Sequence, residues 1–334
     1  MLRIRLNILM FCLLPLSLYS DSNHFIDKLY VNISNYVLNT STYIDDTVSQ
    51  WLGYDQNQSC ISEVSKKQKK TKNIDSFFLN NKYLNDTNDI YVRLRLKTKI
   101  NSRDKESLKA SLSAQLPFDK CKTQWKIFLQ DVNTHANEVK PTDTFTGGLG
   151  LRYDEMDSYI GIDASYSLGL YGGSPYVRGR FKYPLIYNEW KIEPVQIFQY
   201  STKYYFEEET NIYFDRYLND HELFRIQLHR KTASRIKGMD YGLSLQFYRY
   251  TGKNAGFELS QSFFGNTYYN DFYAKDTTYN GINNYVTSFG WRARIWRKWL
   301  YYEIRPTVNF HKDHDYDPTY SLRFYLDFYF GKYN

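Results

Sequence analysis

Long apolar runs are absent from this sequence of 334 residues. A membrane-spanning helix needs roughly 18 or more apolar residues in succession, and the mean hydropathy of the chain is only −0.61. A bundle of membrane-spanning helices is therefore excluded. Charged residues make up an ordinary 24% of the chain, so a wholly disordered protein is not expected either.

Motifs that mark cofactor sites are also missing. The sequence has no GxGxxG segment, no Walker loop and no CxxC pair. These are the short patterns that hold nucleotides or carry out thiol redox chemistry. We therefore expect no cofactor.

Aromatic residues, in contrast, are abundant. They form 19% of the chain, with 34 tyrosines and 22 phenylalanines against 17 glycines and 8 prolines. Tyrosine is favoured both in β-strands and at the boundary between membrane and water. The composition thus points to extended structure beside a membrane.

The N-terminus has the order of a secretory signal peptide over residues 1–20. Arg3 and Arg5 form a basic start, an apolar stretch follows over 8–18, and Ser17 and Ser20 lie near a cleavage point. A buried N-terminal helix is the alternative. Cleavage would leave 41 basic and 36 acidic residues, a formal charge of +5. That mild excess does not indicate a nucleic-acid partner.

Residues 21–53 are predicted to form a helical periplasmic segment, because apolar residues recur every three or four positions. Residues 54–89 are read as a polar linker. Two cysteines, Cys60 and Cys121, would survive export into an oxidising compartment. They are predicted to form a disulfide, with two free thiols as the alternative.

The apolar pattern changes to a period of two from residue 90 and keeps it to the end. In residues 90–100 every second side chain is apolar and its neighbours are polar or basic. Such alternation is typical of a strand between an apolar and a polar medium. Residues 90–334 are therefore predicted to form a closed antiparallel transmembrane β-barrel of about 14 strands, with 12 as the alternative. A soluble sandwich or β-helix is less suitable, because each apolar face would need a protein core.

An even number of strands places both ends of the barrel on the periplasmic side of the outer membrane of a Gram-negative bacterium. The three longest connections in the second half of the chain then fall on the outside, as is usual for such barrels. This arrangement also puts Cys121 in the first periplasmic turn, on the same side as Cys60.

The inward set of side chains is rich in arginine and lysine. Two interpretations remain open: a basic pore that favours anions, and a plugged lumen filled by paired charges and tyrosines. A tight turn centred on Lys298 and Trp299 would place Arg294 opposite Glu303. The predicted pore-lining residues are Arg93, Arg95, Lys97, Arg152, Arg178, Arg180, Arg292, Arg294, Glu303, Arg305 and Arg323.

Catalysis and metal binding are not expected. No serine–histidine pair has the outward position that a barrel phospholipase needs. Asp313, Asp315 and Asp317 resemble the start of a calcium loop, but the glycine and distal glutamate of such a loop are absent. We expect a solvated loop there.

The C-terminal third resembles an uncharacterised family of proteobacterial outer-membrane proteins. In that family a basic strand leads into a Trp-Leu-aromatic turn, then a Glu-x-x-Pro strand, then a strand ending near Phe-Gly. The corresponding residues here are Trp299, Leu300, Tyr301, Glu303, Pro306, Phe330 and Gly331. The chain ends on Asn334 and not on the aromatic residue that barrel-insertion machinery usually reads. The resemblance implies location and fold, not an activity.

The expected function is passive passage of small, anionic solutes through an outer-membrane pore. The alternative is a closed barrel with a structural or envelope-assembly role, whose N-terminal helices bind a periplasmic protein. Outer-membrane lipid and the insertion machinery are the other expected partners.

Overall fold

The computed structural model describes residues 23–51, 74–78, 90–103, 106–118, 125–131, 147–155, 161–171, 173–203, 205–234, 238–252, 254–270 and 278–331. The predicted signal peptide over 1–20 and both cysteines, Cys60 and Cys121, lie outside these residues.

Two α-helices precede the strands. Helix α2 (Asn23–Trp51) is the predicted N-terminal helix, and α4 (Ile74–Phe78) is a short helix within the segment that we expected to be a linker. A 3₁₀ turn, η2 (Lys312–His314), lies near the C-terminus. Within the described residues, neither α-helix is long and apolar enough to cross a bilayer.

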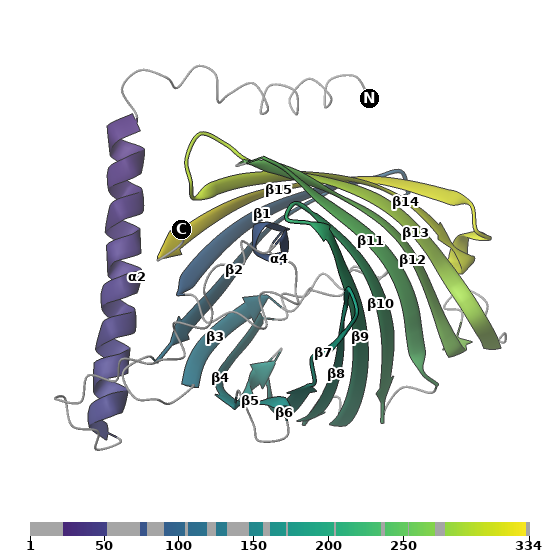
Figure 1. Ribbon diagram of the computed structural model, residues 1–334, viewed down its shortest axis with the longest axis horizontal. Coiled ribbons are helices and arrows are strands. Elements are labelled where there is room, and N and C mark those ends of the chain that lie inside the picture. Colours follow the sequence, from purple (N-terminus) through teal and green to yellow (C-terminus); the bar gives the residue numbers. More distant parts are fainter. Residues whose placement is uncertain are drawn as a thin grey trace.

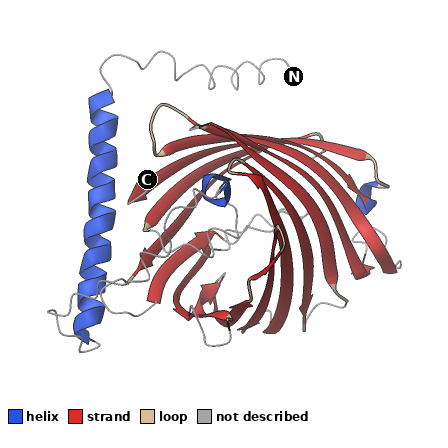
Figure 2. Ribbon diagram, in the orientation of Figure 1, coloured by secondary structure: helices blue, strands red, loops and turns tan. Residues whose placement is uncertain are grey.

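The rest of the described chain is antiparallel β-structure (Figures 1 and 2). The strands are β1 (Tyr91–Asn101), β2 (Ser107–Pro117), β3 (Trp125–Asp131), β4 (Gly147–Glu155), β5 (Asp163–Tyr171), β6 (Ser174–Lys182), β7 (Leu185–Tyr187), β8 (Trp190–Ser201), β9 (Tyr205–Asn219), β10 (Glu222–Ala233), β11 (Asp240–Gly252), β12 (Ala255–Asn270), β13 (Thr278–Arg294), β14 (Leu300–His311) and β15 (Pro318–Gly331).

Two pairings close this sheet into a barrel. Strand β1 pairs with β15, and β6 pairs with β8, while β7 pairs only with β8 as a short hairpin. The wall therefore consists of 14 strands, β1–β6 and β8–β15, which confirms the predicted fold and sets aside the count of 12. Closure leaves no free edge in this 14-stranded wall, as hydrocarbon surroundings require.

The outer surface of the barrel carries the apolar half of each alternating strand. Along β5, for example, Tyr166, Leu168 and Leu170 are exposed while Ser165 and Ser167 are buried. An apolar exterior around a polar interior is the reverse of a soluble protein. The protein is an outer-membrane β-barrel. Exposed outward side chains include Leu108, Leu112, Leu149, Leu151, Val177, Leu259, Phe289, Tyr320 and Leu322.

Both ends of the barrel chain meet at one rim, because Tyr91 of β1 lies opposite Gly331 of β15. From β9 to β15, the connections at this rim (220–221, 253–254 and 295–299) are shorter than those at the other (234–239, 271–277 and 312–317). We call this rim the periplasmic end, following the usual asymmetry of such barrels.

Helix α2 lies against the periplasmic end, where β15 terminates (Figure 1). Tyr30 stacks on Trp299 with ring centroids 4.8 Å apart, and Asp27 forms an ion pair with Arg297 at 2.7 Å. Ser34 accepts a hydrogen bond from the backbone N–H of Gly331. The contacting residues lie on one face of the helix, as their spacing of three or four requires.

One predicted pairing is wrong. Arg294 lies opposite Tyr301, and it is Arg292 that lies opposite Glu303. The turn is not a tight one centred on Lys298 and Trp299, because Ile295 to Trp299 all lie outside the strands and Trp296 adopts a positive φ of 54°. The wider connection shifts the register by two residues, which leaves the inward parity unchanged.

Candidate pore lumen

The interior of the barrel has two walls that differ in charge. The wall formed by β1–β6 carries more basic than acidic side chains among the described residues. The wall formed by β8–β15 carries similar numbers of each. On β1–β6 the inward basic residues are Arg93, Arg95, Lys97, Lys99, Lys109, Lys126, Arg152, Arg178, Arg180 and Lys182, and the inward carboxylates are Asp154 and Asp163.

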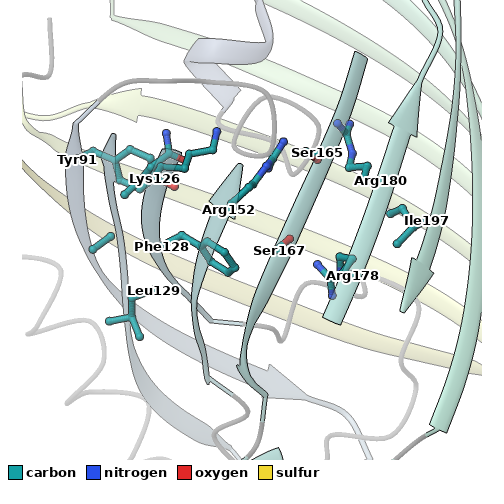
Figure 3. Close-up of a pocket in the computed structure, with 12 residues that line it drawn as sticks. Tyr91, Lys126, Phe128, Leu129, Arg152, Ser165, Ser167, Arg178, Arg180 and Ile197 are labelled. Atoms are coloured by element: carbon teal, nitrogen blue, oxygen red, sulfur yellow. The ribbon is translucent and has the colours of Figure 1, made fainter. Parts of the chain in front are cut away.

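A pocket lies on the basic wall (Figure 3). Lys126 and Arg152 both contact one carboxylate, Asp154, at 2.7 Å and 2.5 Å. Two cations of the basic wall thus contact the same carboxylate. The pocket is lined by Tyr91, Ala114, Gln115, Lys126, Phe128, Leu129, Arg152, Ser165, Ser167, Arg178, Arg180 and Ile197.

Arg178 and Arg180 extend the basic surface from β6. The guanidinium of Arg178 donates to Oε1 of Gln199, a neutral acceptor, at 2.6 Å and 2.8 Å. The same guanidinium lies 5.5 Å from the ring centroid of Tyr176. The buried hydroxyls of Ser165 and Ser167 lie on the neighbouring strand. Together these groups can hold an anion through hydrogen bonds and charge.

A second basic group lies farther toward the outer rim, where β15, β1 and β2 meet. Lys97 lies opposite Lys109, and Lys99 lies opposite Arg323. Nε of Arg323 is buried and has no hydrogen-bond partner among the described residues. Like charges placed directly across strands destabilise a sheet, so this arrangement has a cost in stability that a purely structural wall would avoid.

On the opposite wall, a network that begins at Arg95 of β1 pairs arginines with carboxylates. Asp327 accepts from Arg95 and from Arg292, whose Nη1 lies 2.7 Å from Oδ2. Arg292 also lies 3.4 Å from Glu303. Arg305 forms ion pairs with both Glu303, at 2.9 Å, and Glu258, at 2.6 Å. Three arginines and three carboxylates thus alternate from β1 to β12, and their charges cancel.

Part of the space beside this neutral wall is filled by α4. Phe78 packs against Tyr248, and Phe77 packs against Tyr250 and Tyr301, all of which are inward side chains near the periplasmic end. The lumen therefore has features of both sequence interpretations: paired charges and tyrosines on one side, and a basic surface on the other.

The predicted residues are distributed over both walls. Lys97, Arg152, Arg178, Arg180 and Arg323 belong to the basic surface. Arg95, Arg292, Glu303 and Arg305 belong to the neutral network. Arg93 is 7% exposed and donates to Ser113 at 3.2 Å, and Arg294 lies 5.9 Å from the ring centroid of Tyr301.

Sequence reasoning did not single out Lys126, Asp154 or Asp75. Lys126 follows the strand parity, but it shares the inward face of β3 with Phe128, which masks the polar pattern. Asp75 lies in a polar segment in which a single acidic residue carries no periodic signal.

No protein-family model matches the chain, and no curated protein matches it. The proposed kinship with an uncharacterised family therefore remains a prediction. Among solved structures, an OmpT variant lacking loop L8, from Vibrio cholerae, is 6% identical, with a TM-score of 0.49 over 72% of this chain and 98% of that one. An anion-selective porin from Comamonas acidovorans is 9% identical, with a TM-score of 0.47 over 72% and 98%. A bacterial polysaccharide outer membrane secretin is 14% identical, with a TM-score of 0.43 over 73% and 99%. At these scores the similarity carries no inference about solute or activity.

Proposed function

We propose that the protein is a passive outer-membrane pore that favours small anionic solutes. The observation that carries the proposal is the difference between the two walls of the lumen. Among the described inward residues, basic side chains outnumber carboxylates on β1–β6, whereas the two kinds are similar in number on β8–β15. A polar channel with fixed charge of one sign admits mobile ions of the opposite sign.

The position of α4 supports the same conclusion. Helix α4 packs against the neutral wall, at Leu223 and Tyr248. The pocket described above lies on the other side, beside Lys126, Arg152, Arg178 and Arg180 of the basic wall. A solute that passes the barrel would therefore meet positive charge on its way.

The test is conductance in a planar bilayer under a potassium chloride gradient. The folded wild-type protein should give a reversal potential of the sign expected for chloride. Replacing Arg152, Arg178 and Arg180 together with glutamine should move that potential toward the cation side. No conductance from correctly folded protein, or a preference for potassium, would overturn the proposal.

A matched control removes the same formal charge away from the lumen. Arg103, Arg216 and Arg249 have side chains that are 35%, 42% and 54% exposed and lie outside the pocket. Their joint replacement by glutamine should leave the reversal potential close to that of the wild type. An equal shift in both triple variants would indicate a general effect of net charge and not a selective lumen.

Helix α2 favours a second candidate, binding of a periplasmic protein. Phe25, Tyr36 and Tyr43 are each at least 70% exposed and lie on the face opposite the barrel contacts. Changing all three to serine should abolish an envelope-assembly role, seen as increased sensitivity of the cells to detergent, without altering conductance. Wild-type resistance in that variant would remove this candidate.

A further inference from the structure

We propose that the periplasmic half of the lumen contains a peptide-binding socket, and that α4 is its internal ligand. The ligand class is a short peptide with one carboxylate followed by two aromatic residues, as in Ile74–Phe78. Only the bilayer-current experiment below depends on the proposed pore function. Binding of a peptide to the socket can be measured without it.

The socket has an apolar centre formed by one leucine and one tyrosine of the wall. Leu223 of β10 is fully buried, although it points inward among charged neighbours. It forms one cluster with Ile74, Phe78 and Tyr248. A leucine facing a water-filled lumen would remain hydrated, so its burial by the two residues of α4 stabilises the docked state.

The aromatic rings of α4 meet rings of the wall at favourable distances. The centroids of Phe78 and Tyr248 lie 5.1 Å apart, and those of Phe77 and Tyr250 lie 4.7 Å apart. The ring of Phe77 also lies 6.2 Å from Tyr301 in an edge-on arrangement. Such pairs stabilise an interface beyond the effect of buried area.

Charged groups of the wall fix the orientation of the segment. Nη2 of Arg225 donates to the carboxylate of Asp75 at 2.8 Å, and both side chains are buried. Nε of Arg292 donates to the backbone carbonyl of Phe77 at 3.0 Å. One guanidinium thus binds the acidic side chain and a second binds the backbone two residues later, which gives the socket direction as well as affinity.

A glycine in the wall makes room for the two rings. A Cβ atom at Gly256 would lie 2.9 Å from Cζ of Phe78 and 3.0 Å from Cε1 of Phe77. The same atom would lie 2.9 Å from the backbone oxygen of Arg249. A larger residue at position 256 would therefore crowd both rings as well as the wall at Arg249.

The segment can leave without stranding a buried charge. Arg225 also holds Asp215 through two hydrogen bonds of 2.6 Å and 2.8 Å, and this pair remains when Asp75 departs. Asp75 itself would return to water. Removing one partner of a buried pair is costly mainly when the other is left alone, so the docked segment is exchangeable.

The first experiment measures binding. Residues 74–78 are replaced in the full-length protein by glycine and serine, and folding is checked by heat modifiability in electrophoresis. A labelled peptide of sequence Ile-Asp-Ser-Phe-Phe is then titrated and its fluorescence anisotropy recorded. The peptide should bind the replaced protein, and a peptide with asparagine for the aspartate should bind about tenfold or more weakly, since a charged hydrogen bond is lost.

Two controls make the binding result decisive. The wild-type protein should take up much less peptide, because its own segment occupies the socket. Gly256→Ala in the replaced protein should weaken binding, while Gly290→Ala, an inward glycine whose added Cβ would first meet Arg305, should not. Equal binding by all these proteins, or equal binding of both peptides, would overturn the proposal.

The second experiment separates the socket from the pore. In bilayers the replaced protein should conduct more than the wild type, and the peptide should reduce that current from the periplasmic side. An unchanged current with normal anion preference would disprove occlusion by the segment while leaving the pore intact. Absence of current in both proteins would count against the proposed function, and the anisotropy result would still decide the socket.

Discussion

Arg95 and Asp327 form a two-point ion pair across the seam between the first and the last strand. Nε of Arg95 donates to Oδ1 at 2.5 Å, and Nη2 donates to Oδ2 at 2.7 Å. The carboxylate of Asp327 is almost fully buried and also accepts from Arg292. A single aspartate therefore joins β15 to β1 on one side and to β13 on the other.

Asp327→Asn should destabilise the barrel by about 3 kcal/mol, because it removes a charged partner from the buried Arg292 and from the partly buried Arg95. Urea unfolding in lipid vesicles, followed by tryptophan fluorescence, measures the change. The matched control is Asp317→Asn, which removes an ion pair with Arg103 at 3.5 Å in which the carboxylate is 71% exposed. That exposed pair should contribute less than about 1 kcal/mol. Similar effects of the two variants would show that the seam does not depend on Asp327.

The lipid-facing surface leads to a second prediction. Leu168 lies near the middle of β5 and points outward, while its neighbour Ser167 points into the lumen. Leu168→Arg should destabilise the folded barrel by about 2–4 kcal/mol, the range for arginine near the midplane of a bilayer. Leu168→Ala is the control for lost side-chain volume and should cost clearly less. If arginine were tolerated as well as alanine, this face would not contact hydrocarbon.

The packing of α2 on the rim can be tested with two tyrosines of one helix. Tyr30 stacks on Trp299 at an interplanar angle of 8°, whereas Tyr36 is 73% exposed. Tyr30→Ala should loosen the helix, because an aromatic pair contributes about 1 kcal/mol beyond its buried area. Hydrogen exchange of the backbone amides of residues 26–37 should become faster in that variant and stay unchanged in Tyr36→Ala. Equal exchange in both would contradict the observed contact.

The strands and their inward faces could be predicted from the sequence because the barrel is built from a local rule. Each strand alternates by itself, so residues such as Arg152, Arg178 and Glu303 could be placed inside without knowledge of their neighbours. The pairing of charges could not be predicted in the same way, because it depends on register. A connection two residues out of place moved the partner of Glu303 from Arg294 to Arg292.

The contents of the lumen were harder still to foresee. The contact of Asp75 with Arg225 joins residues far apart in the sequence, and neither residue carries a periodic signal for the other. Leu223 was the available clue, since an inward leucine among polar neighbours needs an apolar partner. Such a partner could come from any of the polar segments, so the sequence alone could not identify α4.

The proposed disulfide is open to a direct measurement, although Cys60 and Cys121 lie outside the described residues. Both would lie on the periplasmic side if the barrel is oriented as proposed. Exported protein alkylated without reduction should then carry no label at either cysteine, and reduced protein should carry two. In the chain-entropy account, closing a loop of this length stabilises the fold by roughly 4 kcal/mol, so reducing agent should also lower the midpoint of urea unfolding. Labelling of both thiols without reduction would refute the bond.

Salt should weaken the selectivity of the pore if the basic wall produces it by charge. The Debye length falls from about 10 Å at 0.1 M salt to about 3 Å at 1 M. At the lower concentration the fields of Lys126, Arg152 and Arg178 would overlap across the space that they line, and at the higher one each would act only on its immediate surroundings. The reversal potential at a fixed ratio of potassium chloride concentrations should therefore decrease toward zero as both concentrations rise. A selectivity that stayed constant would mean that anions are chosen by direct contact with these side chains and not by their combined field.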